Sequence, residues 1–302
     1  MSDRLRLLAL GAHPDDCEVK AGGLAALYAG LGHRVRFVAL TNGATGHHES
    51  GGIELARRRR AEALAAAAVA GIEYEILDNH TGELEPTVAN RKDVIRLLRE
   101  FRPDLVLTHR PWDYHPDHRC AGQLVQDAAY IVTVPNMLPL TDHLERLPVI
   151  MYLGDTFQKP LPLDPDVVVD IDAVMDRKLD MLHCHASQMY EWLPYNRGQL
   201  DQVPAGDAER RAWMGEQRRR YFAATAERYR SRLVELYGEA RGRQVRCAEA
   251  FETCEYGAPL TAELRRRLFP FLPAPCGGGA RRGVRPMEPC PTTRTARQSG
   301  SA

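Results

Sequence analysis

Short apolar runs alternate with segments of helical character along the first half of the chain. The runs have strand length and the nearly continuous hydrophobicity of strands that are buried on both faces. They cover residues 5–10, 35–40, 74–77, 105–108 and 149–153. The helical segments between them cover residues 21–31, 53–70, 89–101 and 120–131. Strands that alternate with helices of this length predict an α/β fold, in which a doubly wound, Rossmann-like parallel sheet is covered by helices.

The second half of the chain has a different character. Residues 171–187 and 208–237 have helical patterns, and residues 244–272 hold short mixed segments. We therefore expect a Rossmann-like core over residues 1–170 and a mainly helical lobe over 171–272 that completes the domain. Residues 273–302 are rich in Gly, Arg, Pro, Ser and Thr, with few large apolar side chains to offset the entropy of ordering. They are predicted to form a disordered tail.

Charge and cysteine content narrow the class of protein. The 40 basic and 40 acidic side chains cancel, so their balance predicts no nucleic-acid partner. No apolar stretch reaches the roughly 18 residues of a membrane span, and the N-terminal run is too short for a signal peptide. The seven cysteines are scattered and form no Cys-x-x-Cys pair, which favours neither a disulfide framework nor a thiolate zinc site. We predict a reduced, cytoplasmic protein without an integral membrane segment.

Two loops rich in His and Asp follow the first and fourth predicted strands. The first contains His13-Pro14-Asp15-Asp16, and the second contains His115-Pro116-Asp117-His118. In an open doubly wound sheet with strand order 3-2-1-4-5, strands 1 and 4 are neighbours at the topological switch point, where ligands bind. The two loops, although distant in sequence, are therefore expected to face one pocket.

The residue types in these loops suit a metal ion. Imidazole and carboxylate groups bind zinc, and a catalytic zinc site uses three protein ligands and leaves one position open. Two histidines and one aspartate match that count. Either motif alone could be a turn or a helix cap, but their occurrence on both sides of the switch point disfavours that interpretation. A nucleotide site is disfavoured as well, because the first turn lacks Gly-x-Gly-x-x-Gly and two carboxylates would repel a pyrophosphate.

The pair of motifs resembles those of the LmbE-like family, also called the PIG-L or GlcNAc-phosphatidylinositol de-N-acetylase family. The resemblance covers roughly residues 5–190. Further matching residues are Thr41-Asn42-Gly43, Arg59, Glu62, Gly71-Ile72 and His185-Ala186-Ser187-Gln188. The resemblance implies a hydrolase that cleaves a linear amide C–N bond, removing the acetyl group from an N-acetylglucosamine-containing substrate. It also implies one Zn²⁺ per chain, a small-molecule or carrier-linked amino sugar as substrate, and a possible homo-oligomer.

The resemblance also implies roles for the motif residues. It assigns His13, Asp16 and His118 as metal ligands, Asp15 as the general base, and His115 as the stabiliser of the oxyanion. In that mechanism Asp15 takes a proton from the attacking water and returns it to the leaving amine. A protonated His115 stabilises the negative charge of the tetrahedral state.

Two further roles and two departures concern the surroundings of the motifs. Asp117 matches a residue that orients its neighbours, and Arg59 matches an arginine that contacts the sugar. Cys17 separates Asp16 from the glutamate that directly follows the aspartates in many members. Thr81 stands where an aspartate is common, which leaves the sugar specificity open.

Two alternatives to an amino-sugar deacetylase stay open. The same site could serve an amidase that acts on another N-acyl conjugate, such as a thiol–sugar conjugate. The chain could also be a sugar-binding member of the fold without turnover. The presence of a base, a full set of ligands and an oxyanion histidine favours an enzyme.

Overall fold

The computed structural model describes residues 4–273, and a seven-stranded sheet lies at its centre. The order of the strands is β3-β2-β1-β4-β5-β7-β6. Their bounds are β1 (Arg6–Gly11), β2 (Arg34–Thr41), β3 (Glu73–Asn79), β4 (Leu105–Thr108), β5 (Val149–Leu153), β6 (Val167–Asp170) and β7 (Ala248–Thr253). Beyond residue 273, the tail that the sequence predicts to be disordered lies outside the described residues.

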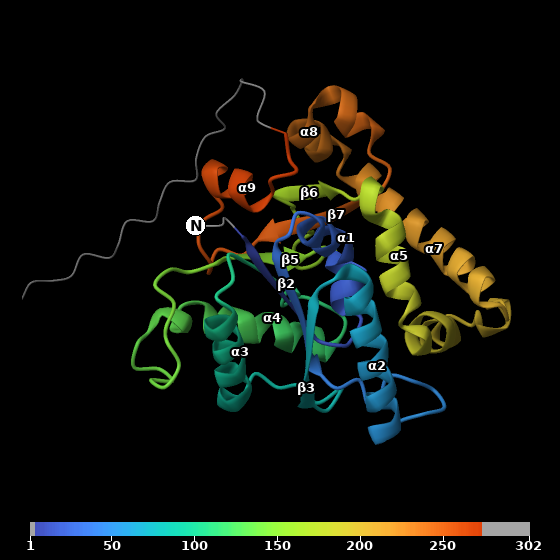
Figure 1. The fold of residues 1–302 in the computed structure, drawn as a ribbon, viewed down its shortest axis with the longest axis horizontal. Helices are drawn as coiled ribbons and strands as arrows, with labels where there is room; N and C mark the ends of the chain where they lie inside the picture. Colours follow the sequence, from blue (N-terminus) through green and yellow to red (C-terminus); the bar gives the residue numbers. More distant parts are fainter. Residues whose placement is uncertain (1–3, 274–302) are drawn as a thin grey trace, which may run out of the picture.

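Helices cover both faces of the sheet. They are α1 (Asp16–Gly30), α2 (Gly52–Ala70), α3 (Val88–Phe101), α4 (Pro116–Ala129), α5 (Met175–His183), α6 (Leu193–Asn196), α7 (Asp207–Arg228), α8 (Arg230–Gln244) and α9 (Ala262–Leu268). Helices α3 and α4 lie on one side, and α1, α2 and α5 lie on the other with α7 outside α5 (Figure 1). The molecule thus has three layers.

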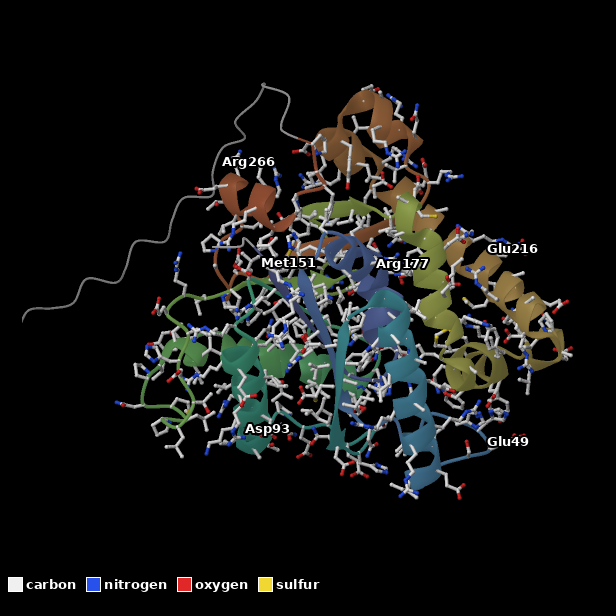
Figure 2. The ribbon with its side chains drawn as sticks, in the orientation of Figure 1. Glu49, Asp93, Met151, Arg177, Glu216 and Arg266 are labelled. Carbon is white, nitrogen blue, oxygen red and sulfur yellow. The ribbon has the colours of Figure 1, made fainter. Side chains whose placement is uncertain are left out.

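Strand β1 shows why the sequence has continuous apolar runs. Leu7 and Ala9 pack into the core under α1 and α2, whereas Leu8 and Leu10 pack into the core under α3 and α4. Both faces of the strand are therefore buried, and alternation with polar residues is lost. Met151 of β5, labelled in Figure 2, lies in the same interior and is fully buried.

The first five strands confirm the predicted α/β fold. They are parallel and follow the order 3-2-1-4-5. The sheet is not parallel throughout, however, because β7 inserts between β5 and β6 and runs antiparallel to both. Strand β7 lies in the region predicted to be mainly helical. Its pattern is interrupted by Glu249, a buried carboxylate, so the sequence gives a weak strand signal there.

Glu249 joins the C-terminal lobe to the core. Its carboxylate accepts hydrogen bonds from the backbone N–H groups of Gly23 (2.7 Å) and Leu24 (2.8 Å) in α1, and it pairs with the buried ammonium group of Lys178 in α5. A Cβ atom on Gly23 would lie 2.9 Å from a Glu249 oxygen and 2.5 Å from the Cγ2 atom of Ile171. The glycine therefore permits the close approach of α1 to β7.

Two helices begin earlier than the sequence predicts. Helix α1 begins at Asp16 rather than residue 21, and α4 begins at Pro116 rather than residue 120. Their first turns are polar, so the apolar periodicity that marks a helix starts only later. The predicted helix over 208–237 divides at Tyr229 into α7 and α8. As a result, both His/Asp motifs extend into helix N-termini instead of lying wholly in loops.

Two observations bear on the class of protein. None of the helices in the described part of the chain is long and apolar enough to cross a membrane. The described cysteines, which are Cys17, Cys120, Cys184, Cys247 and Cys254, are all free thiols.

Candidate metal centre and substrate pocket

The ends of β1 and β4 bring the two predicted motifs together. The strands are parallel neighbours, with Leu10 paired to Thr108 near their carboxyl ends. The chain then leaves the sheet at the same edge in both cases, and the His13 Nδ1 and His118 Nε2 atoms lie 3.2 Å apart. The expectation that the motifs face one pocket at the switch point is confirmed.

The metal-binding groups of three residues converge at this point. Asp16 lies between the two histidines, with Oδ2 3.4 Å from His13 Nδ1 and Oδ1 3.4 Å from His118 Nε2. Each of the three residues is at most 9% exposed. Two imidazole nitrogens and a carboxylate at such separations form a potential metal site with the ligand set of a catalytic zinc centre.

Carboxylates hold the outer nitrogens of both histidines. His13 Nε2 is hydrogen-bonded to Asp117 Oδ2 at 3.0 Å, and His118 Nδ1 forms an ion pair with Asp113 Oδ1 at 3.0 Å. Such pairing fixes the ring orientation and leaves the inner nitrogen to face a cation. Asp117 itself accepts hydrogen bonds from the backbone N–H groups of Gly82 (2.7 Å) and Leu84 (3.2 Å). These contacts place Asp117 where it can orient His13, and they support the fit of the cluster to a metal ion.

His109 is a member of the cluster that the sequence analysis does not single out. Its ring stacks on that of His118, with the centroids 4.1 Å apart, and its Nε2 atom lies 3.2 Å from Asp16 Oδ2. His115 also lies close. Two groups of three residues have ligand atoms that all lie within 4.8 Å of one another: one is His13, His115 and His118, and the other is Asp16, His109 and His118. His118 is common to both sets and lies at the centre of the cluster.

The charges of the cluster perturb its titration strongly. Burial opposes the charged form of His118, but the carboxylates of Asp16 and Asp113 raise its pKa to about 10. Burial likewise opposes ionisation of Asp16, yet the positive charges of His118 and His109 hold its pKa well below the usual value. Burial and the neighbouring His118 lower the pKa of His109 to about 4. In the absence of metal, these shifts favour the protonated form of His118 and the ionised form of Asp16.

Asp15 lines the same pocket and pairs with an arginine of α2. Its Oδ1 atom forms an ion pair with Arg59 Nη2 at 3.0 Å, and the Arg59 side chain is 2% exposed. Arg59 extends from α2 beside Gly43, where a Cβ atom would lie 2.7 Å from Arg59 Cδ. The visible partner of Arg59 is therefore Asp15. A contact between Arg59 and a sugar stays a prediction.

His115 caps α4 and presents its other ring nitrogen to the pocket. Its Nδ1 atom accepts a hydrogen bond from the backbone N–H of Asp117 at 3.1 Å. A neutral His115 with this contact carries its hydrogen on Nε2. Burial and the positive charges of His13 and His118 lower the pKa of His115. The protonated His115 that the family resemblance implies stays a prediction.

The cluster opens into a pocket of about 550 Å³, which is large enough for a small sugar. Its floor is formed by the strand-end motifs, and one wall comes from the C-terminal lobe. The lobe residues in the wall are Gln188, Trp192, Leu193, Asn196, Arg197, Arg218 and Tyr221. Gln188 and Trp192 lie on a π-helical turn, Ser187–Trp192, a distortion that is frequent at functional sites.

Comparison with known proteins decides the family. A model described as PIG-L, GlcNAc-PI de-N-acetylase, matches residues 8–129. Diacetylchitobiose deacetylase of Thermococcus kodakarensis is 34% identical over 209 residues, which cover 65% of this chain and 76% of that protein. The chain belongs to the PIG-L family. The family resemblance seen in the sequence is confirmed, and amide hydrolysis is the reaction class of the deacetylases in it.

Two further relatives extend the comparison to a solved structure and to a different reaction. The solved structure of N,N'-diacetylchitobiose deacetylase from Pyrococcus horikoshii superposes with a TM-score of 0.64 at 25% identity, covering 86% of this chain and 88% of that one. The 4-oxalmesaconate hydratase of Pseudomonas putida is 31% identical over 202 residues, covering 63% of this chain and 76% of that protein. The PIG-L relatives thus include a protein named for a different reaction.

Proposed function

We propose that the chain is a zinc-dependent hydrolase that removes an acetyl group from an N-acetylated amino sugar. The observation that carries this proposal is the convergence of His13 Nδ1, Asp16 and His118 Nε2 within 3.4 Å of one another, with a carboxylate behind each histidine. These residues would hold one Zn²⁺ per chain. The relatives named as sugar deacetylases support the substrate class.

The protein groups around the site supply the proton transfers. When bound, zinc supplies Lewis acidity that activates water and polarises the amide carbonyl. Asp15, held at Oδ1 by Arg59, takes a proton from the attacking water and delivers it to the leaving amine nitrogen. His115 donates from Nε2 to the oxygen of the amide as negative charge develops there. Asp117 contacts two histidines: its carboxylate is hydrogen-bonded to the ring of His13, and its backbone N–H donates to Nδ1 of His115, the residue that caps α4.

Acetate release and metal content test the proposal together. Zinc-loaded protein should release acetate from N-acetylglucosamine derivatives. Asp15→Asn should lower kcat by roughly 10² or more while it retains zinc, because it removes one acid–base group and no ligand. His118→Ala should instead lose zinc on dialysis. Unchanged turnover in Asp15→Asn would refute the role of the base.

Three other outcomes of the screen distinguish the alternatives. Turnover of a different N-acyl conjugate, without turnover of amino sugars, would favour the amidase. Zinc binding without turnover across a wide amide panel would favour a sugar-binding member of the fold. The hydratase relative makes hydration of a carbon–carbon double bond a second candidate reaction. Loss of the absorbance of a conjugated unsaturated acid, without acetate release from any amide, would favour that reaction.

Location and assembly stay part of the proposal. The scattered thiols, free wherever the structure describes them, support a reducing compartment such as the cytoplasm. A homo-oligomer is the expectation from the family, and light scattering coupled to gel filtration tests it.

A further inference from the structure

Two arginines of the C-terminal lobe line the substrate pocket without a carboxylate partner. Arg197 directly follows α6, and Arg218 lies on α7. Neither guanidinium forms an ion pair with any residue between 4 and 273. The polar contact of Arg218 there is between its Nη2 atom and the Met189 sulfur, at 3.1 Å. A thioether is a weak acceptor, so the guanidinium has no direct anionic partner, and the Asp15 carboxylate acts on it only through space.

The arginines that are fully buried in the described structure have strong partners. Arg110 is held by both carboxylate oxygens of Asp155, at 2.7 and 2.8 Å. Arg99 donates to several backbone carbonyls, including that of Val132 at 3.0 Å. Arg59 has Asp15. Arg218 differs, and burial together with the positive charge of Arg197 lowers its pKa to about 10.

Helix geometry directs Arg218 into the pocket. Glu216, labelled at the outer edge of α7 in Figure 2, pairs with Arg220 one turn later on the exposed side. Arg218 is two residues after Glu216 and thus about 200° around the helix axis, on the inner side. Arg197 lies near enough to the Tyr114 phenol for its positive charge to act on that group. The two arginines therefore face the pocket from the lobe, opposite the motif that contains Tyr114.

The acidic groups of the pocket are already occupied. Asp15 is paired with Arg59, Asp113 with His118, and Asp155 with Arg110. Asp16 lies among the histidines of the cluster. The carboxylates of the floor thus have partners of their own, whereas the lobe wall carries two guanidinium groups that form no ion pair and that Asp15 reaches only through space, at Arg218. Such an arrangement favours a ligand that brings its own negative charge.

We propose that Arg197 and Arg218 form a subsite for an anionic substituent, a phosphate or a carboxylate, on the amino-sugar substrate. The inference rests on the proposed function and narrows its substrate class. Guanidinium groups bind both anions through paired N–H donors, and the half-buried position of Arg218 strengthens such a contact. The subsite lies on the lobe wall of the pocket and the metal cluster on its floor, so the subsite would bind a part of the substrate other than the reacting amide.

Matched substrates test the subsite on the zinc-loaded full-length chain. The neutral probe is N-acetylglucosamine, and the anionic probes are its 1-phosphate, its 6-phosphate and N-acetylmuramic acid, which carries a carboxylate. At least one anionic probe should have a KM about tenfold or more below that of the neutral probe. Arg218→Gln should raise that KM by about 10- to 100-fold, and the ratio of the anionic to the neutral KM should rise with it. The phosphate and carboxylate arms show which anion is preferred.

Controls separate charge recognition from folding. Arg220→Gln removes a charge from the exposed side of the same helix and should change neither KM. Arg197→Gln alters an exposed side chain, so it tests the subsite even if Arg218→Gln does not fold. High salt should raise the KM of the anionic probe alone. Equal KM values for all four probes, unaffected by both variants, would overturn the subsite and leave the proposed function standing.

Equilibrium binding separates failure of the subsite from failure of the proposed function. Calorimetry can compare glucosamine with glucosamine 1-phosphate and 6-phosphate without any turnover. Tighter binding of a phosphate, lost in Arg218→Gln, would support the subsite even if no acetate were released from any amide. Equal binding of all three amines by the wild-type chain, together with the equal KM values, would count against it.

Discussion

Substitution of Asp113 tests how the metal cluster is held in place. It forms the ion pair with His118 Nδ1 at 3.0 Å, and its side chain is 5% exposed. The resemblance of the motifs assigns it no role. If the cluster binds zinc through His118 Nε2, Asp113→Ala should weaken the metal site although no proposed ligand is changed.

The expected magnitude follows from the contacts of Asp113. Removal of a carboxylate behind a metal-bound histidine lowers metal affinity by about 10- to 100-fold, which corresponds to about 1.4–2.7 kcal/mol. Asp113→Asn should have a smaller effect. Its amide oxygen can still face His118 Nδ1 and can accept the hydrogen bond that the His115 backbone N–H gives at 3.0 Å. The order of zinc affinities should therefore be wild type, then Asn, then Ala.

Competition with a chromophoric chelator measures these affinities. Asp93→Asn serves as the control, since Asp93 lies at the surface of α3 and pairs with Arg96 at 2.5 Å (Figure 2). Thermal unfolding of the metal-free variants shows whether a loss of affinity comes from misfolding. Wild-type zinc affinity in a folded Asp113→Ala variant would refute the role of this carboxylate.

Three further predictions concern protons and packing. The pKa of His118 is raised to about 10 without metal, so zinc binding at pH 7 should release about one proton or more per site, and the apparent zinc affinity should rise with pH. Calorimetry in buffers of different ionisation heat measures the number of protons released. Gly23→Ala should lower the free energy of unfolding, measured with urea, by about 1–3 kcal/mol. Gly30→Ala should not lower it, because nothing in the surrounding structure lies within 4 Å of a Cβ atom at Gly30. Burial opposes protonation of His185, yet Glu18 raises its pKa, so the pair stabilises the folded protein fully below about pH 6.5 and less as the pH rises. The difference in unfolding free energy between the wild type and His185→Gln should therefore shrink as the pH rises.

Local patterns in the sequence predict the core of the fold. The parallel strands from β1 to β5 are buried on both faces, and this produces apolar runs that need no knowledge of the tertiary structure. The switch-point rule then places the two His/Asp motifs together, because it depends only on strand order. The convergence of His13, Asp16 and His118 is a consequence of topology and could be predicted.

The C-terminal part of the chain is harder to predict. Glu249 interrupts the apolar pattern of β7, so the sequence gives a weak strand signal there. The burial of its carboxylate is explained by its partners, which are the Lys178 ammonium group and the backbone N–H groups of Gly23 and Leu24. These partners lie far away in sequence. No local pattern reveals that a carboxylate in this segment faces the core, so the antiparallel insertion was not predicted.

Asp113 and Arg218 illustrate the same limit within the site. Asp113 lies in the predicted second loop, but its spacing from His118 does not reveal that it contacts Nδ1. Arg218 belongs to a helix that is rich in arginines, and the sequence alone does not distinguish it from Arg219 and Arg220. The distinction arises from partners, since Arg219 pairs with Asp176 and Arg220 with Glu216, whereas Arg218 faces the pocket.

The metal cluster and the lobe wall differ in how far the core of the fold constrains them, and this affects how the family can vary its substrates. The metal cluster is built from strand ends whose positions are fixed by the buried sheet, so the chemistry of the floor is constrained by the core. The wall is built from α6 and α7, outside the parallel part of the sheet, where a change such as Arg218→Gln alters the charge of the pocket without touching a proposed ligand. Substrate preference can therefore change through the lobe while the metal cluster stays the same. A KM that rises in Arg218→Gln for a charged probe, and not to the same extent for the neutral one, beside an unchanged zinc affinity, is the outcome that this separation requires.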